Sequence, residues 1–584
     1  MFFLIKSVLA ITAALGVTAV RPAEHTTRED GHFGLNEQGG PAPFMLHNET
    51  SRSMIQPMKL YIVWYGAGWD SKSKSIVTDF LDGLPKSDFW GIEKKYYQGP
   101  ASKPVGYVTG DVKIGGQHDD NYSLGKFLNS NPNSPDNDVA TVIQNAVNSG
   151  ALPSDVNGFY LVLGDDQTME GSFCTSYCGY HTSTDSDRYY GSSIVGQDLI
   201  YTWVGNPMAC GFNGVYNCGG QFFNSPNGNP GVDSMLSPIA HELGEGGSNP
   251  DTIFNGWNNA DGYENGDNCA YIFGSQRKYD SKGGYFYNQE WNGRRYQIQQ
   301  MWDPATQLCG PYYPKLVPAE CAKLHDIFPS LNLGNDCCNS GYADCADGHV
   351  VAIDVRSNNL TGDIGTVVDK IYKAFPQIVE LRMGNIAGTL TNNFTGSLPA
   401  TLCKMQKLEW LSLARLGLTG SIPQCFSHLQ KLQVLDLPFN KLSGSIPDIF
   451  YFHKYIKKVT LQNNALSGVI PRSLAASTTL TYFFLSNNQN LTGSVPTGFT
   501  AFKGLSAGPI NVSGPIPYCD FTGTALCTST GYKGPTCGLT ASCPVPTGAC
   551  TEMDATQCVQ GKTYLCFPWT GSALAWELLW DGCF

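Results

Sequence analysis

The sequence predicts two folded parts in one chain, an α/β or α+β domain followed by a stack of short repeats. At 584 residues the chain is too long for a single hydrophobic core. Its first half alternates short apolar runs with segments of helical periodicity, whereas its second half repeats one leucine- and glycine-containing pattern about every 24 residues. The 65 Gly and 34 Pro residues indicate many turns and short elements between these patterns.

The N-terminus predicts export from the cell. Residues 1–20 are expected to be a signal peptide, because Lys6 precedes an apolar stretch and Ala19 offers a small-residue cleavage site. Residues 21–57 are polar and rich in Gly and Pro, which predicts a flexible lead. Outside the cell the twenty cysteines would pair as disulfides. Six Asn-X-Ser/Thr sequons are candidate glycosylation sites, at Asn48, Asn121, Asn359, Asn393, Asn490 and Asn511.

Residues 58–312 are expected to form the first domain. Continuous apolar runs predict buried strands, and apolar residues three and four positions apart predict helices. The third helix is expected to stop at Gly246-Gly247, since glycine favours helix ends. The expected strands are 59–66 and 158–163, and the expected helices are 74–81, 138–147 and 234–243.

The third helix carries the one motif that could perform chemistry, His241-Glu242-Leu-Gly-Glu245. Residues i and i+4 share a helix face, so His241 and Glu245 could bind one metal ion. Glu242 stands where His-Glu-x-x-His metalloproteases carry the general base, beside the metal-bound water. Glu264 and Asp267 follow at intervals that suit a further ligand. This pattern predicts one zinc or other divalent metal, and the order of elements before the helix is compatible with a zincin-like fold.

Asp251, ten residues after His241, also matches the offset of a third ligand in one class of zinc peptidases. One observation weighs against a zinc hydrolase, because the second ligand is Glu245 rather than His. Several carboxylates favour harder ions such as calcium or manganese over zinc. The alternative is a helix whose His and Glu side chains form hydrogen bonds or ion pairs in a cleft.

Several short segments of the first domain resemble the EXORDIUM (phosphate-induced protein) family. They include Tyr61-Ile-Val-Trp-Tyr-Gly66, Gly158-Phe-Tyr-Leu-Val-Leu163, the stretch Phe173-Cys-x-x-x-Cys-Gly-Tyr-His181, Thr202-Trp-Val-Gly-Asn206, Ala240-His-Glu242 and Arg294-Arg-Tyr296. The resemblance covers about residues 60–310, nearly half of the chain. It implies an extracellular or cell-wall protein linked to growth, with no settled molecular activity. The members of that family have no repeats of the kind found in the second half of this chain.

The second half contains repeats that resemble the plant-type leucine-rich repeat. The pattern Leu-x-Gly-x-Ile-Pro recurs, and its glycines fall at 396, 420, 444, 468 and 493. Each repeat supplies one short strand, and neighbouring repeats must stack to bury their leucines. The expected parts are a linker and N-terminal cap at 313–348, repeats at 349–518 and a Cys-rich C-terminal module or cap at 519–584. Cys403 and Cys425, in neighbouring repeats, are expected to pair.

The strands of the repeats predict a binding surface. In each strand the leucines point inward, so the residues between them face outward on the concave side. One predicted exposed column contains Glu380, Trp410, Val434, Lys458 and Tyr482, and the next contains Arg382, Ser412, Asp436, Thr460 and Phe484. Aromatic and charged side chains on a rigid surface are typical of protein and glycan interfaces.

These observations predict a secreted recognition or signalling protein whose repeats bind an extracellular protein or a cell-wall glycan. The alternative is a secreted metal-dependent hydrolase, peptidase-like, with Glu242 as base and the repeats as a targeting surface. The net charge of −12 carries no basic stripe, which excludes nucleic acid as an expected partner. No segment after the signal peptide is apolar enough for a membrane span.

Overall fold

The structure is a computed structural model that separates into two compact units. Unit 1 contains residues 1–321 and 332–349, and unit 2 contains residues 322–331 and 350–584. The structure describes residues 18–19, 45–49, 51–129, 137–171, 173, 177–184, 199–210, 218, 225–250, 256–259, 263–311, 318–334, 336–386, 391–475, 477, 479–496, 519–528, 537–541, 556–559, 562–568 and 574–581. The predicted signal peptide apart from Thr18–Ala19, the sequon at Asn511 and the residue Asp251 lie outside these ranges.

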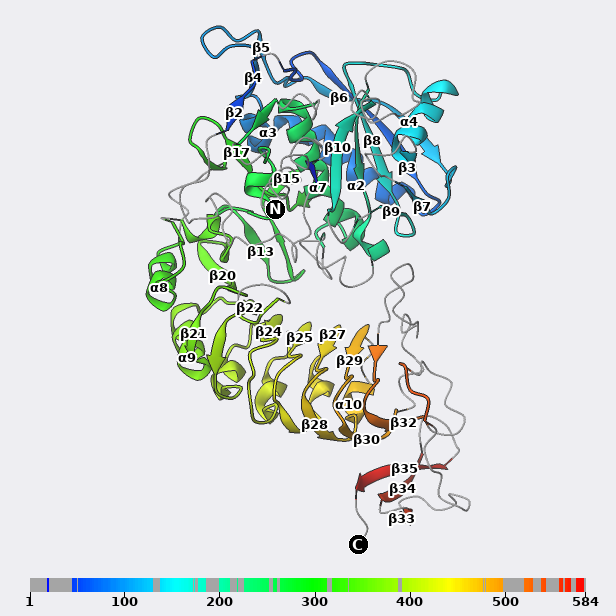
Figure 1. Cartoon of the computed structure of the whole chain (residues 1–584), viewed down its shortest axis with the longest axis vertical. Helices are drawn as coiled ribbons and strands as arrows, with labels where there is room; N and C mark the ends of the chain where they lie inside the picture. The colour runs from blue at the N-terminus through cyan, green and yellow to red at the C-terminus, as the bar shows by residue number, and fades with distance from the viewer. Residues whose placement is uncertain are drawn as a thin grey trace, which may run out of the picture. The chain divides into compact units, whose positions relative to one another are not determined.

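Unit 1 is built on a six-stranded mixed sheet in the order β1-β10-β11-β8-β3-β6 (Figure 1). Strands β11, β8, β3 and β6 pair in parallel, and β10 runs antiparallel to β11 beside them. Strands β8 and β11 are buried along their whole length and β3 is buried except at Lys59, as expected for continuous apolar runs. The strands are β1 (Thr18–Ala19), β3 (Met58–Tyr65), β6 (Val112–Asp120), β8 (Gly158–Gly164), β10 (Gly179–Ser183) and β11 (Ile200–Val204).

Helices cover both faces of this sheet. Apolar side chains of α2 (Ser71–Gly83) and α7 (Pro230–Ser248) share one core cluster with Ile62 and Leu161. Those of α4 (Asp138–Asn148) share a second cluster with Val63 on the opposite face. Each helix starts at a side chain that accepts a backbone N–H bond, namely Asp70, Asn137 and Asn229. The predicted mixed α/β character and the predicted helices at 74–81 and 138–147 are therefore confirmed.

Two predictions for unit 1 are wrong. Helix α7 does not stop at Gly246-Gly247 but continues through both glycines to Ser248. A Cβ atom at Gly246 would lie 2.1 Å from the Phe159 ring, so this glycine permits close packing rather than a helix end. The predicted flexible lead also ends earlier than residue 57, because Met45 and Met54 are buried and β2 pairs with β12.

Short elements complete unit 1. They are β2 (Leu46–His47), η1 (Leu84–Lys86), α3 (Asp88–Glu93), β4 (Tyr97–Gln98), β5 (Gly106–Tyr107), β7 (Phe127–Leu128), β9 (Met169–Glu170), η2 (Pro207–Cys210), β12 (Trp257–Asn258), η4 (Asp267–Cys269), β13 (Lys278–Asp280), β14 (Tyr285–Tyr287), β15 (Gln289–Trp291), β16 (Arg294–Tyr296), β17 (Met301–Asp303), β18 (Leu308–Gly310), η6 (Cys337–Asn339) and β19 (Ala343–Ala346). Helix α8 (Glu320–Ile327) lies at the division between the units. Within the described residues, none of the helices has the length and apolar composition that a membrane span requires.

The repeats form a parallel ladder of short strands. Figure 1 shows β22, β24, β25, β27 and β29 following one another along the chain, and their leucines are buried. The strands are β20 (His349–Asp354), β22 (Glu380–Arg382), β24 (Trp410–Ser412), β25 (Val434–Asp436), β27 (Lys458–Thr460), β29 (Tyr482–Phe484) and β31 (Cys519–Asp520). A second set contains β21 (Thr361–Asp363), β23 (Asn393–Thr395), β26 (Ser443–Ser445), β28 (Ala465–Gly468), β30 (Asn490–Ser494) and β32 (Ala525–Cys527). The return segments include α9 (Ile364–Ala374), η7 (Ala400–Lys404), η8 (Gln424–His428), η9 (Phe450–Phe452) and α10 (Arg472–Ala475).

A column of buried asparagines joins each repeat to the next. Asn440 donates from Nδ2 to the carbonyls of Leu413 and Leu437, and its Oδ1 accepts from the amides of Leu416 and Leu418. The buried Asn392 and Asn488 and the half-buried Asn464 make similar bonds, which reach backbone carbonyls of the preceding repeat. These side chains satisfy buried backbone groups that short strands leave unpaired.

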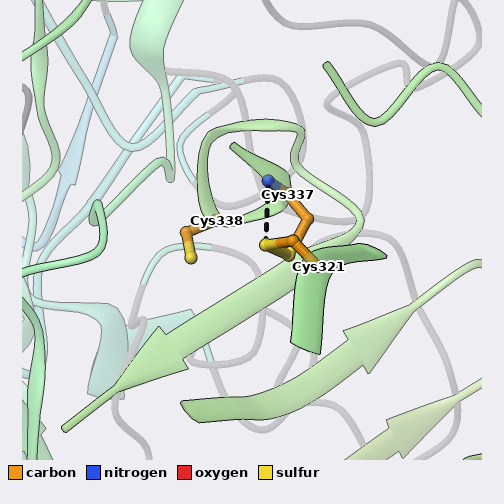
Figure 2. A group of neighbouring side chains, drawn as sticks. All are labelled: Cys321, Cys337 and Cys338. Carbon is orange, nitrogen blue, oxygen red and sulfur yellow. Dashed lines mark hydrogen bonds between the residues drawn. A yellow bond between two sulfur atoms is a disulfide. The ribbon is translucent and has the colours of Figure 1, made fainter. Parts of the chain in front are cut away.

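Disulfides brace both units. Cys403–Cys425 joins neighbouring repeats, as predicted. Cys321–Cys337 and Cys338–Cys345 lie before the first repeat strand, and Figure 2 shows Cys321, Cys337 and Cys338 close together. These three thiols could form a metal-binding group by proximity, but their sulfurs are bonded in disulfides. The remaining described bridges are Cys178–Cys218, Cys269–Cys309 and Cys519–Cys537.

The C-terminal module contains a three-stranded antiparallel sheet of β33 (Thr556–Val559), β34 (Lys562–Pro568) and β35 (Leu574–Asp581).

Candidate functional site

Helix α7 places His241, Glu242 and Glu245 in the interior of unit 1. All three side chains are completely buried. His241 and Glu245 lie one helical turn apart on the same face, and Nε2 of His241 is 3.0 Å from Oε1 of Glu245. The sequence prediction that these two side chains converge is therefore confirmed.

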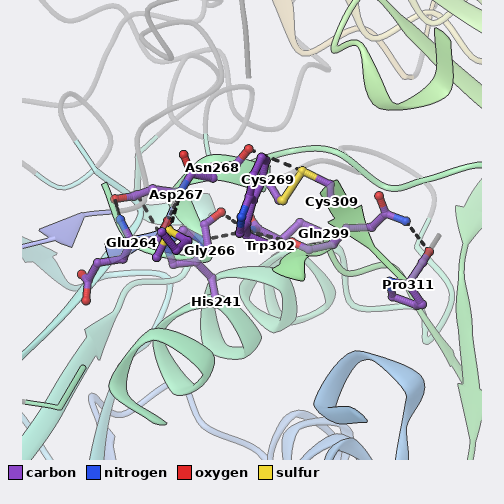
Figure 3. Close-up of a disulfide and its surroundings, with 12 residues drawn as sticks. His241, Glu264, Gly266, Asp267, Asn268, Cys269, Gln299, Trp302, Cys309 and Pro311 are labelled. Atoms are coloured by element: carbon purple, nitrogen blue, oxygen red, sulfur yellow. Dashed lines mark hydrogen bonds and ion pairs between the residues drawn. A yellow bond between two sulfur atoms is a disulfide. The ribbon is translucent and has the colours of Figure 1, made fainter. Parts of the chain in front are cut away.

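The loop at residues 263–269 brings Glu264 and Asp267 to the same place. Figure 3 shows this loop beside His241, with the Cys269–Cys309 disulfide at its end. The amide of Asp267 donates to Oε1 of Glu245 at 2.9 Å. Gly266 passes so close that an added Cβ atom would lie 2.8 Å from the same oxygen. The loop thus needs a glycine at 266 to reach the helix.

His181, on β10, is the member of the cluster that the sequence analysis did not identify as a site residue. It is completely buried, and its Nε2 lies 3.1 Å from the carbonyl oxygen of Asn249 at the end of α7. A carbonyl only accepts, so Nε2 carries the proton and Nδ1 faces the carboxylates. The only signal in the sequence was its place at the end of the segment Phe173–His181, which supported the family resemblance.

Five short contacts within the described residues join the two imidazoles to four carboxylates. Nδ1 of His181 is 3.1 Å from Glu242 Oε2 and 3.6 Å from Glu245 Oε2. Nε2 of His181 is 3.7 Å from Glu264 Oε1, and Nε2 of His241 is 3.7 Å from Asp267 Oδ1. With the 3.0 Å contact of His241 and Glu245, they define the His–carboxylate cluster: His181, His241, Glu242, Glu245, Glu264 and Asp267.

Two amide side chains, those of Asn249 and Gln299, form hydrogen bonds with members of the His–carboxylate cluster. Asn249 donates from Nδ2 to Glu264 Oε1 at 2.6 Å. The Gln299 side-chain amide lies 2.8 Å from Nδ1 of His241 and also donates to the carbonyl of Gly266. Such contacts fix the ring orientation of an imidazole before it meets a ligand.

A further buried carboxyl group, Glu93 on α3, lies behind the His–carboxylate cluster. Asn265 donates from Nδ2 to both of its oxygens at 3.1 Å. Burial raises the pKa of Glu93 well above its usual value, and the nearby charge of Glu245 raises it further. Both effects favour the neutral form of the Glu93 carboxyl group.

The arrangement has the composition of a cation site. Ligand atoms of His181, Glu245 and Glu264 lie within 4.8 Å of one another, and so do those of His241, Glu242 and Glu245. Nitrogen and carboxylate donors together suit zinc, manganese or iron(II). Without a cation, so many buried carboxylates would be costly unless they took up protons.

The predicted columns on the repeat strands are in register. Glu380, Trp410 and Lys458 lie in one row with Val434 and Tyr482, because each strand pairs with the next without a shift. The second row contains Arg382, Ser412, Asp436, Thr460 and Phe484. Charged side chains of the rows form ion pairs. Arg382 pairs with Glu380, and Nζ of Lys458 lies 4.0 Å from Oδ1 of Asp436.

The exposure predicted for these rows is wrong for part of them. Trp410 is only 6% exposed and Val434 is completely buried. The guanidinium of Arg382 lies 4.4 Å from the centre of the Trp410 ring and shields part of this ring from solvent. Tyr482 and Phe484 are half-buried and keep part of their rings accessible. The accessible aromatic surface therefore lies toward the last repeats.

Comparison with known proteins identifies both parts of the chain. The model of the phosphate-induced protein 1 conserved region matches residues 47–311, and that of the leucine-rich repeat matches residues 431–452. Protein EXORDIUM-like 5 of Arabidopsis thaliana is 31% identical over 288 residues, 44% of this chain and 74% of that protein. EXORDIUM-like 3 is 31% identical over 43% of this chain and 78% of its own length. PHOSPHATE-INDUCED 1 of Nicotiana tabacum is 27% identical over 46% and 88%, respectively.

Among solved structures, the leucine-rich-repeat ectodomain of the receptor kinase SOBIR1 from Arabidopsis thaliana is 26% identical. It has a TM-score of 0.26 and covers 30% of this chain and 94% of that one. Pollen receptor kinase 3 is 25% identical, with a TM-score of 0.28, over 35% of this chain and 85% of that one. With two relatives at 31% identity matched over 74% and 78% of their length, the chain belongs to the EXORDIUM (phosphate-induced protein) family and carries leucine-rich repeats after its family domain.

Proposed function

We propose that this chain is a secreted recognition or signalling protein whose repeats bind an extracellular protein or a cell-wall glycan. The disulfides of both units support a location outside the cell. All five sequons within the described residues, at Asn48, Asn121, Asn359, Asn393 and Asn490, are exposed and hence accessible to glycosylation.

The observation that carries this proposal is the register of the repeat strands. It lines up Lys458 and Asp436 beside Tyr482 and Phe484 on a rigid parallel sheet. A fixed surface loses little conformational entropy when it binds, and aromatic rings supply apolar contact area at low entropic cost. Half-buried aromatics beside charges suit a partner that offers both apolar and polar groups, such as a sugar ring or a peptide.

The experiment is a binding screen of the full secreted chain against arrays of cell-wall glycans and of extracellular plant proteins. A partner that binds wild type is then tested against a Tyr482→Ser/Phe484→Ser variant, for which we expect at least a tenfold weaker affinity. Tyr451→Ser/Phe452→Ser is the matched control, because both rings are more than half exposed but lie on a return segment. Equal binding by both variants would reject the repeat strands as the binding surface.

A second candidate function, a metal-dependent hydrolase, is supported by the convergence of the His–carboxylate cluster. Four parallel strands, a neighbouring antiparallel strand and a following ligand helix support the zincin-like interpretation. In this function a cation bound by His241 and Glu245 would polarise the scissile carbonyl, and Glu242 would take a proton from the attacking water. The complete burial of Glu242 argues for binding rather than turnover.

Peptide libraries incubated with zinc- or manganese-loaded protein test this second function. Hydrolysis that is lost in Glu242→Gln while the metal content stays unchanged would support it. Cleavage by Glu242→Gln at the wild-type rate would exclude Glu242 as the base.

A further inference from the structure

The outer edge of strand β10 is covered by two residues of the N-terminal segment. On its inner side β10 pairs with the full length of β11, and on its outer side it pairs with β1. Thr18 lies opposite His181 and Ala19 opposite Tyr180, in antiparallel register. All five residues of β10 are buried with β1 in place. The cover of this edge therefore depends on Thr18 and Ala19.

Those two residues belong to the predicted signal peptide. Cleavage after Ala19 would remove Thr18 and Ala19 from the exported chain. No other strand pairs with this edge among the residues that the structure describes. A bare strand edge presents a row of N–H and C=O groups with which another extended chain can pair. The exported protein would therefore offer a place for one further strand.

The backbone of β10 directs known groups to this edge. Just after β10, the amide of Thr184 donates to the carbonyl of Leu199, on the side of β11. Successive residues of a strand direct their N–H and C=O groups to opposite sides, so those of His181, three residues earlier, face outward. In an antiparallel ladder this makes Thr18 and His181 a hydrogen-bonded pair, whereas the amide of Ala19 points away from β10.

The same edge runs past the His–carboxylate cluster. The side chain of His181 points to α7, where its Nδ1 lies 3.1 Å from Oε2 of Glu242. Gly179 lies on the same face, because a Cβ atom there would be 3.3 Å from Oε1 of Glu242. Residues directly opposite each other on paired strands point their side chains to the same face. A chain paired with β10 would therefore direct the side chain opposite His181 toward the α7 face.

We propose that the exported chain binds an extended peptide as an antiparallel strand on the outer edge of β10. The main chain of the peptide bonds to the outward backbone groups of His181 and its neighbours, which is how an added strand gains affinity. In this structure Thr18 and Ala19 occupy the place of that peptide. The inference concerns binding and requires no cleavage. It rests on the proposed export of the chain, because removal of the signal peptide frees the edge.

The test uses the full secreted chain and a fluorescent synthetic peptide with the sequence of residues 15–22, which contains both residues of β1. N-terminal sequencing first establishes where the secreted chain begins. We expect saturable binding in fluorescence anisotropy, with about tenfold weaker affinity when the peptide is N-methylated at the amide of Thr18, because a backbone hydrogen bond is lost. The matched control is N-methylation at the amide of Ala19, which points away from β10 and should change the affinity by less than about threefold.

The outcomes separate this inference from the proposed export. A secreted chain that retains Thr18 and Ala19 overturns the predicted signal cleavage and, with it, the free edge. A chain that begins after Ala19 but does not bind the peptide overturns the edge site alone. Equal losses of affinity from the two N-methylations also overturn it, because binding would then not follow the register of the strand. None of these results bears on the binding surface of the repeats.

Photocrosslinking locates the peptide without any variant of the protein. A benzophenone group in place of the peptide's alanine, which the register places opposite Tyr180, should attach to β10 or β11. Mass spectrometry of proteolytic fragments identifies the attached segment. Attachment to the repeats instead would overturn the edge of β10 as the binding site.

Discussion

The two units bury polar side chains in different ways. In the repeats, asparagines such as Asn440 form a column of neutral amides whose donors and acceptors both bond to backbone groups. In unit 1, a cluster of buried ionisable groups brings imidazoles and carboxylates face to face. Neutral amides with backbone partners stabilise a fold, whereas converging ionisable groups cost stability, which makes them a candidate binding site. The comparison separates a structural polar core from the proposed site.

The largest effect is expected from the disulfide that supports the His–carboxylate cluster. Cys269–Cys309 spans 40 residues and ends the loop that carries Glu264 and Asp267. Loss of a crosslink of this span costs about 4 kcal/mol of unfolding free energy. We expect Cys269→Ser/Cys309→Ser to lower stability by this amount and to weaken metal binding, measured by chemical denaturation and metal titration.

The matched control is Cys403→Ser/Cys425→Ser, which removes a bridge of 22 residues from the repeats. It should cost about 3 kcal/mol and leave metal binding unchanged. A loss of metal in this control would contradict the assignment of the site to unit 1.

Removal of one asparagine tests the structural core of the repeats. Asn440→Ala leaves two backbone carbonyls and two backbone amides without their partner, and each unsatisfied buried group costs about 1–3 kcal/mol before relaxation. We expect a total loss of about 3 kcal/mol in thermal or chemical denaturation of the repeats. Gln424→Ala, at an exposed amide, should change stability by less than about 0.5 kcal/mol. Equal losses in the two variants would reject the asparagine column as a structural device.

A smaller effect is expected at Lys457, a half-buried cation in the repeats. Burial lowers the pKa of Lys457 to about 8, although the charge of Glu409 opposes the shift. The unfolded chain then holds more protons than the folded chain between pH 8 and 10.5, so the unfolding free energy rises with pH through that window. We expect Lys457→Met to remove this rise and to gain about 1–2 kcal/mol at pH 7. If the unfolding free energies of wild type and variant changed with pH in the same way, burial of Lys457 would not destabilise the fold.

Local sequence patterns predicted a large part of the fold. The 24-residue period placed the repeat strands in register, because each repeat contacts only its neighbours. His241 and Glu245 converged as predicted since one helical turn separates them. Close packing at Gly246 was invisible in the sequence, because a glycine that ends a helix and one that admits a neighbouring ring look the same.

His181 could not be predicted as a site residue from local patterns. It lies 61 residues before Glu242 in the sequence, and its position depends on the antiparallel pairing of β10 with β11. The burial of the Trp410 ring depends in the same way on a distant residue, Arg382, which lies one repeat earlier. Contacts between distant segments follow from strand order and side-chain direction, which a single sequence does not specify.

The constant 24-residue step from β24 to β29 has an evolutionary consequence. Asn440 and Asn464 each bond to backbone groups of their own repeat and the one before, and the strands pair at the same interval. A gene duplication that inserts one whole 24-residue unit preserves every such bond and adds one residue to each row of the outer face. The repeats can therefore lengthen or shorten by recombination while the family domain stays unchanged, so the two halves of the gene are free to diverge at different rates.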